Sequence, residues 1–121
     1  MAGTLTRSEF EEVVGSVVDT LPGWVVDQID NLHVFVEERP TAEQDPHGQG
    51  LLGLYEGVSL LDRSSGYFGN MPDKITIFRQ PHLQLGLPEA ELREEIRKTV
   101  LHELGHHLGI DDKRLHEIGW A

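Results

Sequence analysis

The chain has 121 residues, no cysteine and a net charge of −11 at neutral pH. This length predicts one domain over residues 1–121, large enough for one core but without room for separate additional lobes. The charge repels phosphate groups and therefore argues against nucleic acid as a partner. Without cysteine, neither disulfides nor thiolate metal ligands can form.

No apolar stretch approaches 18 residues, and the N-terminus lacks a basic region followed by an apolar one. We therefore expect no membrane span and no signal peptide. The absence of cysteine fits a reducing compartment, so the expected location is the cytoplasm.

The first half of the chain is predicted to form two helices and a strand. Apolar residues recur at helical spacing over residues 6–21, with Ser8 as a candidate N-cap and Pro22 and Gly23 ending the helix. A short second helix is expected around residues 24–29, and residues 32–37 alternate like a strand. Residues 39–50 contain two prolines and two glycines and are predicted to form a polar loop.

The second half adds two strands and two helices. Residues 51–57 and 74–79 are predicted strands, separated by the turn-rich segment 64–72. Residues 88–108 form one long predicted helix and residues 111–118 a short terminal one, and the mixed charges of residues 89–98 indicate a solvated helix face. The expected class is α+β, with a small mixed sheet packed on the long helix. Residues 51–56 are the candidate edge strand for an extended peptide.

A metal-site motif lies in the predicted long helix. The run from His102 to His106 has the form HExxH, and histidines four residues apart lie about 40° apart around a helix, so both imidazoles can reach one cation. Glu103 lies about 100° from His102 and projects beside that cation. The pattern is typical of a catalytic zinc site in which the glutamate is the general base, so the expected cofactor is Zn²⁺.

A third protein ligand is expected just beyond this helix. Gly109 adopts left-handed backbone angles cheaply, so it favours a helix end that turns the chain back toward the metal. Three carboxylates follow it, Asp111, Asp112 and Glu117. Asp111 is also a candidate N-cap of the terminal helix, and Glu117 becomes a ligand only if that helix folds back over the site.

The longer run from His102 to Asp112, HExxHxxGxxD, resembles the minimal zincin-like metallopeptidases, which are related to the Asp-zincins. The stretches LYEGVSL (54–60), MPDKITIF (71–78) and LHEIGW (115–120) carry the rest of the resemblance. It implies a minimal zincin fold, a zinc-dependent metallopeptidase activity and Asp112 as the third ligand beside His102 and His106. We favour this ligand set over the alternatives Asp111 and Glu117.

Three protein ligands leave a fourth position for a water molecule, whose pKa zinc lowers to about 7. Glu103 would take the proton of this water as it attacks the carbonyl of a peptide or protein substrate. An oxyanion also needs a hydrogen-bond donor, and Tyr55 and Tyr67 are predicted as catalytic residues for this reason, with His116 as a further candidate.

Two other functions remain open. A zinc-stabilised module would bind a peptide or protein without cleaving it. Metal-dependent endoribonucleases of rRNA maturation share the ligand spacing, but they carry a histidine as third ligand and lack the glutamate, so Glu103 and the acidic charge argue against that function. The sequence does not predict an oligomeric state.

The remaining histidines are not predicted to be ligands. His107 lies about 100° around the helix from His106, so we expect it to pack in the interior or to support a ligand. His33, His47 and His82 have no partner at ligand spacing and are predicted to be structural or exposed.

Overall fold

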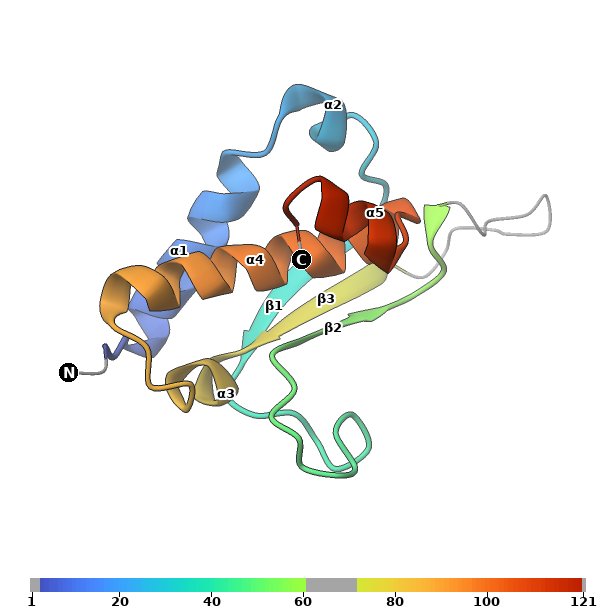
Figure 1. Ribbon diagram of the computed structural model, residues 1–121. Helices are drawn as coiled ribbons and strands as arrows, with labels where there is room; N and C mark the ends of the chain where they lie inside the picture. The colour runs from blue at the N-terminus through green and yellow to red at the C-terminus, as the bar shows by residue number, and fades with distance from the viewer. Residues whose placement is uncertain (1–2, 61–71, 121) are drawn as a thin grey trace.

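A computed structural model describes residues 3–60 and 72–120, in which a long helix lies across a small sheet (Figure 1). The α+β class and the order of the long elements agree with the sequence prediction. In chain order the elements are α1 (Arg7–Asp19), α2 (Gly23–Val26), β1 (Leu32–Glu37), β2 (Gly53–Glu56), β3 (Asp73–Phe78), α3 (Arg79–Leu83), α4 (Glu89–Leu108) and α5 (Asp112–Glu117).

The sheet has the strand order β1-β3-β2 and is mixed, as predicted. β1 runs parallel to the central strand β3, and β2 runs antiparallel to it, with Tyr55 opposite Ile75. Among the described strands β2 pairs with β3 alone, so its other side is an edge. The candidate peptide-binding strand therefore does lie at an edge of the sheet.

The core lies between the sheet and the two long helices. Ile75 and Ile77 of β3 are fully buried and belong to one apolar cluster with Phe10 of α1 and with Ile96 and Leu104 of α4. α1 packs against α4, and α4 lies next to β2 and β3 (Figure 1). In the part of the chain that the structure describes, no helix combines the length and the apolar character needed to cross a membrane.

Two details of the helices differ from the sequence prediction. The N-cap of α1 is Thr6 rather than Ser8: the Thr6 hydroxyl accepts from Glu9 N–H and the Glu9 carboxylate accepts from Thr6 N–H, so the two residues form a capping box. α3 was not predicted. Its Pro81 lies in the first turn, where a helix needs no N–H, so this proline starts a helix instead of preventing one.

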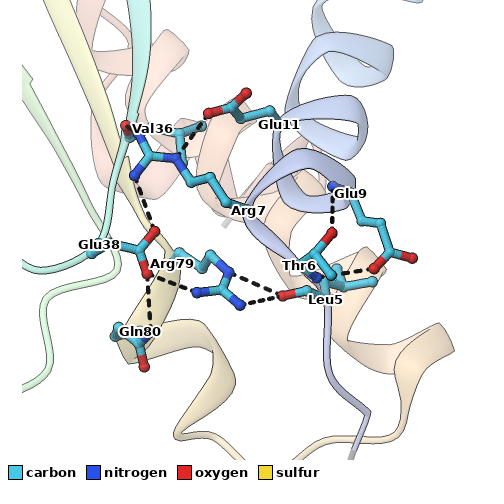
Figure 2. A network of polar contacts seen from close by, with 9 residues as sticks. All are labelled: Leu5, Thr6, Arg7, Glu9, Glu11, Val36, Glu38, Arg79 and Gln80. Carbon is cyan, nitrogen blue, oxygen red and sulfur yellow. Dashed lines mark hydrogen bonds and ion pairs between the residues drawn. The ribbon is translucent and has the colours of Figure 1, made fainter.

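A network of polar contacts joins the start of α1, the end of β1 and the start of α3 (Figure 2). The Glu38 carboxylate accepts from Gln80 Nε2 at 3.0 Å, from Arg79 Nη1 at 2.7 Å and from Arg7 Nη1 at 3.0 Å. The Arg79 guanidinium also donates twice to Leu5 O. These donors, with Gln80 and Arg79 foremost, lower the pKa of Glu38 to about 2.

Candidate metal centre

The last two turns of α4 present the residues of the HExxH motif. Its histidines are partly exposed, with side-chain exposures of 31% for His102 and 36% for His106. Gly109 ends the helix in the left-handed conformation, with φ of 81°, and its N–H bonds back to the carbonyls of Gly105 and His106. The chain then turns directly into α5, so the helix end predicted at Gly109 is confirmed.

The N-terminal end of α5 brings a carboxylate to these histidines. Asp111 is the N-cap of α5, and its side chain accepts from Arg114 N–H at 2.8 Å. Asp112 is the first residue of the helix, and its side chain is 81% exposed. Asp111 is therefore engaged in capping, while the neighbouring Asp112 faces the imidazoles.

His102, His106 and Asp112 form a group that fits a metal ion. Their ligand atoms lie within 4.8 Å of one another. Asp112 Oδ1 lies 3.4 Å from His106 Nε2 and 3.8 Å from His102 Nε2. Bonds of about 2.0–2.1 Å at tetrahedral angles require ligand atoms about 3.3 Å apart, so small side-chain adjustments would complete this set of two nitrogens and one oxygen around zinc.

Glu103 lies beside the ligand group but is buried, with 8% of its surface exposed. Its Oε1 lies 3.3 Å from His106 Nδ1. Burial raises the pKa of the Glu103 carboxyl, an effect that the imidazoles of His106 and His102 and a hydrogen bond with the backbone of Tyr55 oppose. A buried carboxyl with a raised pKa beside a metal group is a candidate for proton transfer.

A cleft of about 290 Å³ runs between β2 and α4 and ends at the metal group. Gly53 lines the cleft and lies so close to α4 that a Cβ there would be 2.7 Å from Thr99 Cγ2. Because Leu52 O accepts from Phe78 N–H, strand alternation directs the peptide groups of Gly53 away from β3 and toward the outer edge. The cleft is lined by Leu51, Leu52, Gly53, Glu95, Lys98, Thr99, His102 and Glu103.

A sequence model of one protein family, described as zincin-like metallopeptidase, matches residues 29–120. The chain belongs to this family. The family resemblance noted in the sequence is therefore confirmed, and the fold described above is a minimal zincin fold.

Among solved structures, this zincin-like chain resembles a conserved hypothetical protein from Thermus thermophilus. The two chains are 26% identical, and the match covers 86% of this chain and 94% of the other, with a TM-score of 0.59. A search of curated proteins finds no match.

None of the other predicted site residues that the structure describes belongs to the metal group of this zincin-like domain. The Tyr55 hydroxyl donates to Asp73 Oδ2 at 2.5 Å, so an oxyanion would have to compete with that carboxylate. Glu117 accepts from Arg114 Nη1 at 3.1 Å and is not part of the metal group, and His116 is exposed on α5. Tyr67 lies outside the described residues. The catalytic roles proposed for Tyr55 and Tyr67 stay predictions.

Asp73 is a buried acidic residue that the sequence analysis missed. Asp73 is 2% exposed and accepts from His107, which is fully buried as predicted. The available signal was strand alternation, because Asp73 lies on the same face of strand 73–78 as the buried Ile75 and Ile77, and a buried carboxylate must be paired.

Proposed function

We propose that the protein is a zinc-dependent metallopeptidase that hydrolyses peptide bonds, with Glu103 as its general base. The observation that carries the proposal is the position of Glu103. Among the described residues that line the cleft, it is the only carboxylate that also touches the metal group, at 3.3 Å from His106, and its burial raises its pKa. A solvated surface carboxylate has neither property.

His102, His106 and Asp112 would hold the zinc ion. When bound, zinc supplies Lewis-acid polarisation of the scissile carbonyl and a water that loses its proton near neutral pH. Glu103 takes the proton from the attacking water and delivers it to the leaving amide nitrogen, so that the C–N bond breaks as a carboxylic acid and an amine form.

The edge strand β2 supports a peptide as the substrate. An extended chain lying along β2 would pair with the outward peptide groups of Gly53, and this pairing would align its scissile bond along the cleft toward Glu103. Leu51 and Leu52 offer apolar contact to its side chains, while Lys98 and Glu95 contribute opposite charges.

The test is cleavage of a diverse peptide library by the zinc-loaded protein, with zinc-loaded Glu103→Gln as the control. The variant has nearly the same shape, keeps the three ligands and should lose roughly 10²-fold or more of the activity. Cleavage at the same sites and rate by both proteins would show contamination or a wrong base.

Absence of cleavage by both proteins, with zinc bound in each, would favour the alternative of a module that binds peptides without turnover. His106→Ala addresses the metal site independently, because two ligands rarely hold zinc against a chelator. The cytoplasmic location expected from the sequence stays a prediction.

A further inference from the structure

A buried carboxylate joins the edge strand, the central strand and the active-site helix. Asp73, the first residue of β3, accepts two hydrogen bonds on the same oxygen, Oδ2. Tyr55 of β2 donates its hydroxyl at 2.5 Å, and His107 Nδ1 of α4 lies at 2.8 Å. Buried polar groups held in this way specify how the elements around them pack.

The ring of His107 is held at both of its nitrogens. Asp30 N–H donates to Nε2 at 3.3 Å, so Nε2 carries no hydrogen and Nδ1 is the protonated nitrogen that donates to Asp73. The His107 and Tyr55 rings also meet edge to face, with their centres 5.9 Å apart. This fully buried imidazole is therefore fixed in one tautomer and one orientation.

Gly57, just after β2, leaves room for this arrangement. It has φ of 150°, and a Cβ on it would lie 2.5 Å from Asp73 Oδ1. The close approach of this backbone to the carboxylate places Asp73 against the end of the edge strand.

The two outer residues of this group, His107 and Tyr55, are each connected to the site through the backbone. His107 follows His106 in the helix, and the backbone of Tyr55 is hydrogen-bonded to Glu103. Helix side chains reach roughly 5–6 Å from the axis, so a rotation of about 10° would move the His106 ring by about 1 Å. A displacement of that size separates a good metal site from a loose one.

We propose that Tyr55, Asp73 and His107 form a positioning network that fixes the rotation of α4 and holds Glu103 against β2. Tyr55 then acts as a positioning residue, through its hydroxyl on Asp73, and not by donating to the oxyanion. Any effect of this network on peptide hydrolysis rests on the function proposed above. Its effects on zinc affinity and on hydrogen exchange of the Tyr55 amide do not.

The experiment compares Tyr55→Phe and His107→Asn with the wild-type chain. Zinc affinity is measured by chelator competition, and protection of the Tyr55 amide by hydrogen exchange in the metal-free protein. We expect zinc affinity to fall about 10-fold in His107→Asn, the low end for residues that orient ligands, and about 3-fold in Tyr55→Phe. Tyr55 amide exchange should accelerate in both variants.

His82→Asn is the matched control for the loss of a buried, doubly bonded imidazole. His82 is fully buried, with Nδ1 at 2.7 Å from Phe78 O and Nε2 at 2.9 Å from Thr99 Oγ1. It lies outside the positioning network, so its variant should lose stability while zinc affinity stays within about 2-fold. General destabilisation would instead weaken zinc binding equally in both histidine variants.

The double variant Tyr55→Phe/His107→Asn completes the test. Because the two residues belong to one network, its loss of zinc affinity should be smaller than the product of the two single fold-losses. Tyr55→Phe with wild-type zinc affinity and wild-type amide exchange would overturn the proposal, and lower turnover in that variant would then support an oxyanion role. If His107→Asn does not fold, Tyr55→Phe alone decides.

A wild-type protein that cleaves no peptide would refute the peptidase function. Zinc affinity and Tyr55 amide exchange could still be measured and would still test the network.

Discussion

Leu115 of α5 lies directly over Gly105 of α4, where a Cβ on the glycine would be 2.2 Å from Leu115 Cδ2. Leu115 is fully buried by this contact and others. Since α5 begins at Asp112, the seating of Leu115 on the bare backbone of α4 determines where the third carboxylate lies. Gly105 thus serves the metal site through packing.

Gly105→Ala should therefore weaken zinc binding. The added methyl group would clash with the buried side chain of Leu115, and we expect Leu115 and α5 to shift together, at a cost of about 1–3 kcal/mol in the free energy of unfolding. We expect zinc affinity to fall at least about 10-fold, because Asp112 moves with α5. Chelator competition and urea unfolding measure the two effects.

Gly15→Ala is the matched control, since Gly15 lies in α1 and a Cβ there would meet nothing within 4 Å. That variant should gain up to about 1 kcal/mol of stability from helix propensity and keep its zinc affinity. Unchanged zinc affinity in Gly105→Ala would mean that α5 is not held by this contact.

Substitutions at Asp112 and Asp111 should have different effects, the first on zinc affinity and the second on helix capping and stability. Asp112→Ala removes one of three ligands, so its zinc affinity should fall by roughly 10²-fold or more. Asp111→Ala removes the N-cap bond to Arg114 and should cost about 1 kcal/mol of stability, with zinc affinity within a few fold. The opposite ranking in a chelator titration would make Asp111 the ligand.

The arrangement of the motif on α4 was predictable because the spacing of residues along a helix determines which side of the helix each side chain faces. His102 and His106 had to share a face, and the Gly109 helix end was confirmed by its φ of 81°. The ligand set itself stays a prediction, since the structure shows only that the three side chains converge.

The network around Asp73 was not predictable in the same way. His107 and Asp73 are 34 residues apart, and Tyr55 and Asp73 are 18 apart, so no local period relates them. Their meeting depends on the pairing of β2 with β3 and on the packing of α4 against the sheet. Such tertiary contacts follow from the fold as a whole, which a helix or strand pattern does not contain.

Gly53 and Thr99 should be coupled across the cleft. A Cβ on Gly53 would lie 2.7 Å from Thr99 Cγ2 and 3.2 Å from Glu103 Cγ, so Gly53→Ala should cost about 1–3 kcal/mol of stability. Thr99→Ser removes that methyl group and keeps the hydroxyl that bonds His82. The double variant should therefore regain part of the loss in urea unfolding.

The Thr99→Ser single variant supplies the fourth corner of this double-mutant cycle. Strictly additive losses would indicate that β2 accommodates the alanine by moving as a whole, away from both Thr99 and Glu103.

Glu38 should make the stability of the fold depend on acid pH. Its pKa lies at about 2 in the folded protein, below the ordinary value of 4.5 that we assign to the unfolded chain. A carboxyl whose pKa is lowered by folding stabilises the protein above the unfolded value and loses this contribution as pH falls from about 4.5 to about 2. Because 40% of the Glu38 side chain is exposed, solvent screens its ion pairs with Arg79 and Arg7, and its contribution to stability is modest.

Urea unfolding of the wild type and of Glu38→Gln, at about pH 6 and about pH 2.5, measures this dependence. The wild type should be the more stable protein at the higher pH, and the difference should shrink at the lower one because the unfolded chain then binds a proton at Glu38 while the folded protein, with its lower pKa, largely does not. Glu12→Gln, on the exposed side of α1, controls for the removal of one negative charge from an acidic chain. A difference that stays constant with pH would mean that Gln80, Arg79 and Arg7 do not favour the charged form of Glu38.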